Sequence, residues 1–436
     1  MEARLTTSAT AATSATRMTP LEAFDYRGKT VLLRLDVNAP IDPVTKRIRN
    51  DNRFRKSVPT LRYLLDAGAR VAILAHQGDT LDYQNLIPMR EHAERLGALA
   101  DAPIPYVDDV CGPAAVAAVK ALRDGEAVFL GNLRYLTEEV SGFEKEVKLT
   151  ADEMRDTWLV RTLAPLADFY VNDAFSAAHR NSPSMVAFQR LLPTAGGRQL
   201  YAEYDALSKV LAGAAKPAVF VLGGAKISDA FGMMDQVLRN GTADRILACG
   251  LTGQIFLLAK GWKLGAATDR FLSDKDLAVF VEQARAMLAA YPDKVETPTD
   301  LAYAVDGRRT VVGLDALPLE KALFLDIGPA TCARFDAVLA SAGTVFANGP
   351  AGVYENPEFE AGTRAVLESI ARSPGYSVIG GGDTVSAAAK YVDDARFGYI
   401  CTAGGAMVRF LAGKPLPLIE AMEAAYERDC QKGRNL

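Results

Sequence analysis

The sequence is poor in the residues that build disulfide frameworks, metal centres and histidine-based catalytic sites. Its 436 residues include only five cysteines and three histidines, and no two cysteines stand in a Cys-x-x-Cys pair. An odd and scattered set of cysteines argues against a disulfide scaffold, and so few histidines argue against a zinc site. We therefore expect free thiols, as in a reducing cytosol, and a cytoplasmic protein.

Strong charge and long apolar runs are also missing. The net charge is −4 and Lys and Arg form no dense tract. We therefore expect neither nucleic acid nor a membrane surface among the partners. No apolar run reaches the roughly 18 residues that span a bilayer. A chain of 436 residues is too long for one core and predicts two domains of roughly 200 residues each.

The common nucleotide-binding signatures are absent. The chain has no Gly-x-x-x-x-Gly-Lys-[Ser/Thr] loop, no Gly-x-Gly-x-x-Gly after a strand, and neither His-Arg-Asp nor Asp-Phe-Gly. These absences argue against P-loop enzymes, typical dinucleotide-binding dehydrogenases and protein kinases.

The N-terminal segment differs in composition from the rest. It is rich in Ser, Thr and Ala and has no apolar core, so it is not a secretory signal. We expect residues 1–18 to be a disordered tail, with a transit peptide as the alternative.

Beyond this segment, short apolar stretches alternate with amphipathic ones. The expected strands are 30–38, 70–76, 127–133, 168–175, 217–224, 245–250, 321–328, 344–350, 376–382 and 397–405. Helical patterns lie between them, and a helix over 196–213 is expected to join the two halves. Alternating strands and helices predict parallel sheets covered on both faces. We therefore predict an α/β fold of two Rossmann-like lobes with parallel sheets, hinged around a central cleft.

The strand ends differ between the halves. In the first half they carry polar side chains with arginines nearby, which suits a small anionic substrate. In the second half they are rich in glycine, as in GGAK (223–226), NGP (348–350) and GGGDT (380–384), which suits phosphates held by main-chain N–H groups. Gly, Asn and Asp are also ordinary turn residues, which accounts for about half of these positions but not for the difference between the two halves of the chain.

Taken together and in this order, several segments resemble the phosphoglycerate kinase family between Tyr26 and Ala421. They are LLRLDVNAPID, DFYVNDAFSAAHR, VLGGAKISD, DIGPAT, NGPAGVYENPEFEAGT, VIGGGDT and TAGGAMVRFLAGKPLP. The segments LAHQG and GLTGQIFLLAKG are similar in sequence to those of archaeal members. The resemblance implies a glycolytic and gluconeogenic transferase that is a monomer. It would move a phosphoryl group between Mg-ATP or Mg-ADP and the carboxylate of 3-phosphoglycerate.

The resemblance also assigns roles along the chain. Residues 19–200 would bind the acid, 201–403 would bind the nucleotide, and 404–436 would return to the N-terminal domain. The implied acid-binding residues are Asp36, Asn38, Arg53, His76, Arg134 and Arg180. The implied nucleotide-binding residues are Lys226, Gly250, Asn348, Glu355, Gly381, Gly382, Asp383 and Thr384. Arg53 and Lys226 would be catalytic, and Asp383 would hold the Mg²⁺ cofactor.

These residue types suit the chemistry. A carboxylate that attacks a phosphoryl group brings two anions together, so cations and N–H dipoles must neutralise charge in the transition state. A carboxylate is already ionised at neutral pH, so no general base is needed. The same residues also have purely structural interpretations. Arg134 and Arg180 could form surface ion pairs, and Asp383 could be the N-cap of a helix. We place His92 on a helix surface without function.

Some positions depart from the family pattern. Asp79 replaces an arginine that grips the distal phosphate of the acid, and Ala230 replaces a second lysine after GGAK. Gly131, Ala347 and Cys401 are further departures. Asp79 is therefore a specificity candidate, and the hypothesis is an acceptor with less negative charge at its distal end. Two alternatives stay open: an acyl-phosphate-forming kinase of the same fold acting on another carboxylic acid, and a non-catalytic nucleotide-binding paralogue.

Overall fold

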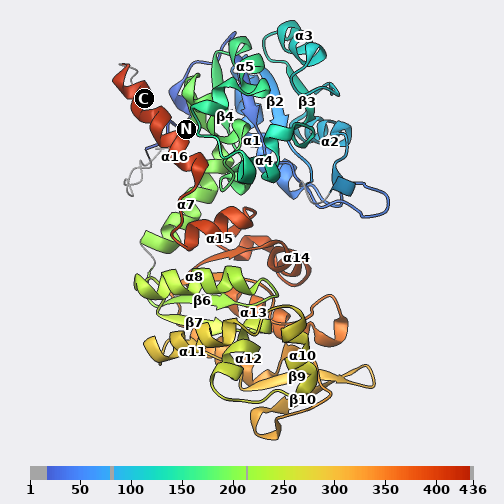
Figure 1. Cartoon of the computed structure of the whole chain (residues 1–436), viewed down its shortest axis with the longest axis vertical. Helices are drawn as coiled ribbons and strands as arrows, with labels where there is room; N and C mark the ends of the chain where they lie inside the picture. Colours follow the sequence, from blue (N-terminus) through green and yellow to red (C-terminus); the bar gives the residue numbers. More distant parts are fainter. Residues whose placement is uncertain (1–16, 79–82, 213–214, 433–436) are drawn as a thin grey trace, which may run out of the picture. The chain divides into compact units, whose positions relative to one another are not determined.

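The structure is a computed structural model that describes residues 17–78, 83–212 and 215–432. The chain forms two compact units (Figure 1). The first comprises Met1–Ala174, Arg180–Leu200 and Pro417–Leu436, and the second comprises Phe175–His179 and Tyr201–Leu416. The expected segment 404–436 is thus divided between the two units. The expected tail lies outside the described residues except for Arg17 and Met18, and Met18 is buried.

The first unit contains a five-stranded parallel sheet in the order β3-β2-β1-β4-β5. The strands are β1 (Thr30–Arg34), β2 (Arg70–Ala75), β3 (Ala127–Asn132), β4 (Phe169–Asn172) and β5 (Thr194–Gly196). The helices are α1 (Asn52–Asp66), α2 (Arg90–Ala100), α3 (Pro113–Ala121), α4 (Ser141–Glu146), α5 (Trp158–Leu163), α6 (Pro183–Val186) and α16 (Pro417–Gln431). The central strands β1 and β2 are buried along nearly their whole length and are apolar apart from Thr30, Arg34 and Arg70, because helices cover both sheet faces. The strand order reverses between β1 and β4, where open α/β sheets bind ligands.

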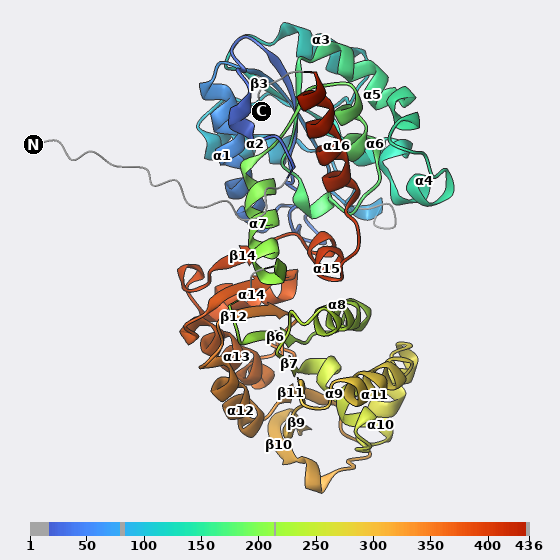
Figure 2. The same ribbon diagram turned by 90° about the vertical axis from the view of Figure 1, so that its left-hand side faces the viewer.

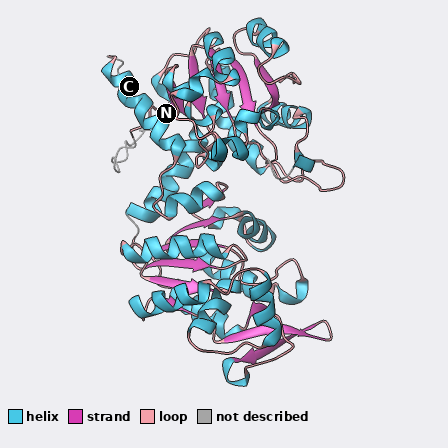
Figure 3. Cartoon of the chain, viewed as in Figure 1, coloured by secondary structure: helices cyan, strands magenta, loops and turns pink. Residues whose placement is uncertain are grey.

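The second unit is built around a six-stranded parallel sheet in the order β14-β13-β12-β6-β7-β8 (Figure 3). Its strands are β6 (Ala218–Leu222), β7 (Arg245–Ala248), β8 (Val295–Glu296), β12 (Thr344–Asn348), β13 (Tyr376–Gly380) and β14 (Tyr399–Cys401). Its helices are α8 (Ile227–Arg239), α9 (Gly250–Ala259), α10 (Ala266–Asp274), α11 (Phe280–Ala290), α12 (Pro329–Leu339), α13 (Ala361–Arg372), α14 (Gly382–Tyr391) and α15 (Gly405–Leu411). Helix α7 (Arg198–Ala212) runs from the first unit into the second. Here the strand order reverses between β6 and β12.

A third sheet was not expected. It is antiparallel, in the order β10-β9-β11, and belongs to the second unit. Strand β11 (Phe324–Ile327) lies in segment 321–328, which we predicted for a parallel sheet, so that prediction is wrong. Strands β9 (Asp300–Val305) and β10 (Arg308–Gly313) form a hairpin whose turn residues, Asp306 and Gly307, have φ of 49° and 77°. Both angles are positive, as a two-residue type I′ turn requires.

Each unit has its own hydrophobic core. In the first unit it is centred on buried residues of β1, β2 and α1, including Val31, Ile73 and Leu61. In the second it lies between the six-stranded sheet and α12, α13 and α14, and includes Val345, Phe335 and Leu367. Helix α16, near the C-terminus, packs on the first unit against α6 and β5 (Figure 2). None of the described helices combines the length and apolar character that crossing a membrane requires. The predicted α/β class, with a parallel sheet in each unit, is confirmed.

Candidate functional site

The carboxyl end of β1 brings three predicted acid-binding residues together. Arg53, on α1, donates a hydrogen bond to the buried Asp36 carboxylate. The Asn38 N–H also donates to this carboxylate, at 3.4 Å. The Asn38 side-chain oxygen accepts from the Gly78 N–H at 3.2 Å. This arrangement orients the Arg53 guanidinium at the edge of the sheet.

His76 follows β2 at the same edge. Its Nδ1 lies 2.8 Å from Nη2 of Arg34. A guanidinium only donates hydrogen bonds, so Nδ1 must be the acceptor and the ring proton must sit on Nε2. Burial, with the positive charges of Arg134, Arg34, Arg53 and Arg180, holds the pKa of His76 well below 6.5. His76 is therefore a neutral ring that donates from Nε2 at neutral pH.

Arg34, which was not among the predicted site residues, forms buried hydrogen bonds that position the side chains at this edge of the sheet. It is 1% exposed, and its Nε donates to the Ser184 hydroxyl at 3.3 Å. The Ser184 N–H and hydroxyl donate in turn to the Glu139 carboxylate at 2.6 and 2.7 Å. Burial raises the pKa of Glu139, while Ser184 and the charges of Arg34 and Arg134 lower it. A charged residue at the end of an all-apolar strand was the available signal.

The other two predicted arginines occupy different surroundings. Arg134 is buried, its main-chain N–H donates to the Asn132 side chain at 3.0 Å, and its guanidinium donates to the Glu139 carbonyl. Reading Arg134 as a surface ion pair is therefore wrong. Arg180 forms an ion pair with Glu144 at 3.7 Å. Together with Arg34 and Arg53, they give the region around His76 a strongly positive potential.

The segment after β2 is tied down by buried polar groups. The Gln77 N–H donates to the Asn132 side chain at 3.2 Å, and that side chain donates back to the Gln77 carbonyl at 2.9 Å. His92, placed on a helix surface by the sequence analysis, is instead fully buried, with Nε2 2.9 Å from Gln77 Oε1. Burial lowers the pKa of His92 to about 4. Asp79, the specificity candidate, lies outside the described residues.

In the second unit, the strand-order reversal between β6 and β12 is lined by glycine. The Gly223 N–H donates to the Asn348 carbonyl at 3.0 Å, and the Gly349 N–H donates to the Thr384 hydroxyl at 2.7 Å. Gly349 has a φ of 88°, and a Cβ there would lie 2.2 Å from the Gly223 carbonyl oxygen. Only glycine allows this close approach of two chain segments.

These strand ends enclose a cavity of ≈ 190 Å³, which we call the phosphate cavity. Six of the predicted nucleotide-binding residues line it: Lys226, Asn348, Gly381, Gly382, Asp383 and Thr384. The N-terminus of α14 lies at this cavity and adds main-chain N–H groups. Gly381 is the N-cap of α14 and Asp383 lies in its first turn, so the N-cap reading of Asp383 is wrong.

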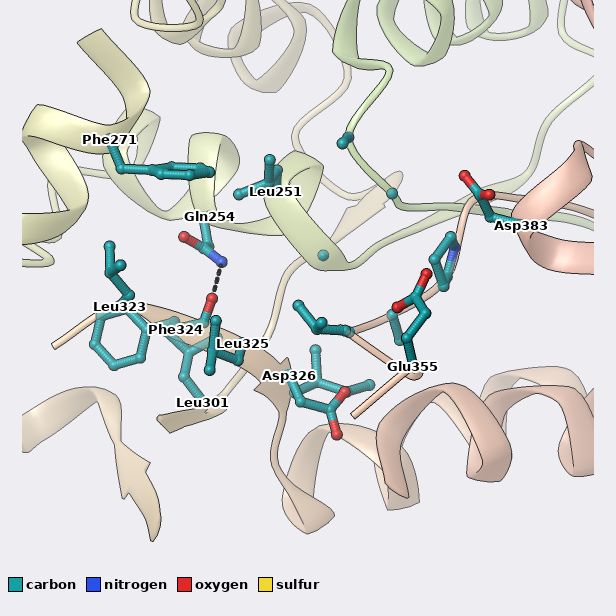
Figure 4. Close-up of a pocket in the computed structure, with 18 residues that line it drawn as sticks. Leu251, Gln254, Phe271, Leu301, Leu323, Phe324, Leu325, Asp326, Glu355 and Asp383 are labelled. Carbon is teal, nitrogen blue, oxygen red and sulfur yellow. Dashed lines mark hydrogen bonds between the residues drawn. The ribbon is translucent and has the colours of Figure 1, made fainter. Parts of the chain in front are cut away.

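A second cavity, of ≈ 290 Å³, shares Gly224, Ala225, Pro350 and Asp383 with the first (Figure 4). We call it the base cavity. It contains the two remaining predicted residues, Gly250 and Glu355, and its other walls are mainly apolar. A polar, glycine-lined cavity that adjoins an apolar one matches the phosphate and base ends of a nucleotide.

The phosphate cavity also bears on magnesium. Asp383 and Asp229 both contribute to its lining, and Asp229 was not selected from the sequence although it follows Lys226 by three helical positions. Within the described ranges, no cluster of three or more His, Cys, Asp or Glu residues could hold a metal alone. Mg²⁺ is usually bound by one or two carboxylates together with substrate phosphates, so these residues fit Mg²⁺ carried by a nucleotide.

Ala230, in place of the family's lysine, is buried on α8.

Comparison with known proteins decides the family. The model described as Phosphoglycerate kinase matches residues 21–414. The chain belongs to the phosphoglycerate kinase family. The phosphoglycerate kinase of Thermococcus kodakarensis is 43% identical over 412 residues, which cover 93% of this chain and 97% of that protein. The phosphoglycerate kinase of Pyrococcus furiosus is 40% identical over 413 residues, which cover 94% of this chain and 98% of that protein.

A solved structure agrees with this family membership. The crystal structure of phosphoglycerate kinase from Pyrococcus horikoshii has a TM-score of 0.87 and 37% sequence identity to this chain. The superposed region covers 94% of this chain and 100% of the chain in that crystal structure. The predicted resemblance to the phosphoglycerate kinase family, and to its archaeal members, is confirmed.

Proposed function

We propose that this chain is a working phosphoglycerate kinase, which transfers a phosphoryl group between ATP or ADP and the carboxylate of 3-phosphoglycerate. The phosphate cavity carries this proposal, because it combines glycine strand ends, a helix N-terminus and Lys226 with the carboxylate of Asp383. Family membership supports it, since the family uses ATP and ADP. The arginine-rich edge of the first unit supplies the acid-binding side.

On the nucleotide side, we assign phosphate binding to Lys226, Asn348, Thr384 and the main chain at Gly381 and Gly382. Main-chain N–H groups and a helix N-terminus favour negative charge without needing long side chains. Asp383 would hold Mg²⁺ with the nucleotide. When bound, Mg²⁺ would neutralise charge on the phosphates. Gly250 and Glu355 would lie beside the base and ribose in the base cavity.

On the acid side, we assign the acceptor to Asp36, Asn38, Arg53, His76, Arg134 and Arg180. Arg53, oriented by Asp36, would face the carboxylate and the transferring phosphoryl group. There its positive charge would offset the charge that builds up as two anions approach. His76 would donate a hydrogen bond from Nε2, and Arg134 and Arg180 would hold the distal phosphate. Each proposed role rests on the family pattern together with the positions described above.

The two units would divide the work, the first binding the acid and the second the nucleotide. An acyl phosphate hydrolyses in water, so we expect transfer to require hinge closure that excludes water. One chain contains both sets of residues, so we propose that a monomer is sufficient. We also propose a cytoplasmic location, which the small, odd and scattered set of cysteines in the sequence supports.

A turnover assay tests the function. Purified protein with Mg-ATP is offered 3-phosphoglycerate or one of several other carboxylic acids, and acyl phosphate is trapped with hydroxylamine. We expect the highest kcat/KM with 3-phosphoglycerate. A clear preference for an acid without a distal phosphate would favour the alternative acyl kinase. No turnover with any acid, despite nucleotide binding, would favour a non-catalytic paralogue.

A further inference from the structure

The base cavity contains few polar side chains. Much of its wall is apolar and includes Leu251, Phe271, Leu301 and Leu323 (Figure 4). The polar side chains that line it are Gln254, Asp326, Glu355 and Asp383. In an apolar cavity, a few placed polar groups set orientation and specificity, because any polar group left unpaired there is costly.

Three of these polar groups do not serve the apolar end of the cavity. Asp326 accepts through Oδ2 from Arg309 at 2.6 Å and from the Gly362 N–H at 2.7 Å, whereas its Oδ1 accepts from no described residue, and the side chain lies away from Leu251 and Phe271 (Figure 4). Glu355 and Asp383 lie away from Leu251 and Phe271, toward the side of the cavity shared with the phosphate cavity (Figure 4). Gln254 is therefore the polar side chain placed among the apolar residues.

The orientation of the Gln254 amide is set by its hydrogen bond. Its Nε2 donates to the main-chain carbonyl of Phe324 at 3.0 Å. A carbonyl can only accept, so the amide nitrogen must face Phe324 and the oxygen must point the other way. Figure 4 shows this oxygen directed toward the side of the cavity where Phe271 lies. Within the described part of the chain, Gln254 Oε1 accepts no hydrogen bond, so a donor on the ligand would pair with it.

We propose that Gln254 is a specificity-determining residue that selects a 6-aminopurine, with its Oε1 accepting from the exocyclic amino group of adenine. The inference deepens the proposed function and rests on it. A 6-oxopurine would present a carbonyl oxygen to Oε1, and two acceptors cannot pair. Sites built to bind an N–H group reject analogues that lack it, so the preference should be at least about tenfold.

Inosine diphosphate is the sharpest probe, because it carries a 6-oxo group and, unlike guanosine diphosphate, no amino group anywhere on the ring. Calorimetry on the full-length protein would give Kd for Mg-ADP and for Mg-inosine diphosphate. We expect wild type to bind ADP at least about tenfold more tightly. In Gln254→Met, which keeps the side-chain length but removes the acceptor, we expect the ratio to fall toward one, mainly by loss of ADP affinity. Gln254→Leu is a second variant in case the first does not fold.

Gln189→Met is a matched control. Gln189 is a buried glutamine of the first unit whose Nε2 also donates to a main-chain carbonyl, that of Met185, at 2.5 Å. We expect this variant to keep the wild-type preference for ADP. Equal affinities in wild type, or an unchanged ratio in both Gln254 variants, would overturn the inference. If neither nucleotide binds to wild type, the proposed function itself fails, and the inference fails with it. Loss of turnover with a normal ADP preference would contradict only the proposed function.

Discussion

The buried Arg34 should be critical to the stability of the first unit. Arg34→Met replaces the charged arginine side chain with an uncharged, unbranched one at a site that is 1% exposed. It takes away the donor to His76 Nδ1 at 2.8 Å and the donor to the Ser184 hydroxyl at 3.3 Å. It also leaves Glu139, itself 1% exposed, without one of the charges that favour its ionised form.

The expected magnitude follows from the buried charge. Removing one partner from a buried set of opposite charges typically costs about 3–5 kcal/mol. Arg34 and Glu139 are linked through the Ser184 hydroxyl rather than directly, so we expect the lower end of this range, about 3 kcal/mol of unfolding free energy. Adding Glu139→Gln removes the orphaned charge, so the double variant should recover at least about 1 kcal/mol relative to the sum of the single changes.

Urea unfolding can read the first unit separately. The sequence has two tryptophans, Trp158 in the first unit and Trp262 in the second. A Trp262→Phe background therefore leaves fluorescence that reports the first unit only. Arg62→Met is the control, since Arg62 pairs with Asp66 on the exposed surface of α1 and should contribute less than about 1 kcal/mol. If Arg34→Met costs no more than Arg62→Met, or if the double variant recovers nothing, the reasoning about this cluster is wrong.

Two further predictions concern the first unit. His92 has a pKa near 4 in the folded protein against 6.5 when exposed, so its contribution to stability is complete above pH 6.5 and is lost as pH falls toward 4. In His92→Gln, which keeps a donor for Gln77 but cannot be protonated, unfolding free energy measured between those pH values should fall less than in wild type, by up to about 3 kcal/mol; identical pH profiles would contradict this. Arg53→Ala should lower kcat by at least about a hundredfold while changing KM for ATP much less, and a near-normal kcat in steady-state assays would show that Arg53 does not act in the transition state.

The sequence predicted elements whose signals are local. Each parallel strand of more than two residues, apart from β5, begins within a predicted apolar segment, because residues buried on both sheet faces leave a continuous apolar run. Every predicted nucleotide-binding residue lines one of two cavities, because each lies at the carboxyl end of a strand or shortly after it in the chain. Strand ends of a parallel sheet meet at one edge, so positions far apart in sequence converge.

The features that were not predicted from the sequence depend on how strands pair and on which side chains are buried. The run 321–328 gives no sign of whether its neighbour is parallel or antiparallel, since an apolar run is the same in both. The Asp-Gly pair at 306–307, between two β-rich segments, is the local signal for the β9–β10 hairpin. His92 was placed on the surface because its helix is amphipathic around it, yet its burial depends on Gln77 from another loop. Arg34 was overlooked because a single charge does not disturb the strand pattern.

The most direct test of the central claim is whether the phosphate cavity binds a nucleotide together with Mg²⁺ through Asp383. ADP is titrated into the full-length protein by calorimetry, with Mg²⁺ and with EDTA, for wild type, Asp383→Ala and the control Asp394→Ala on a neighbouring surface turn. We expect Mg²⁺ to tighten binding by at least about tenfold in wild type and in the control, and to have little effect in Asp383→Ala. Binding in wild type that is indifferent to Mg²⁺, or Mg²⁺-dependence that survives in Asp383→Ala, would contradict the assignment of this cavity.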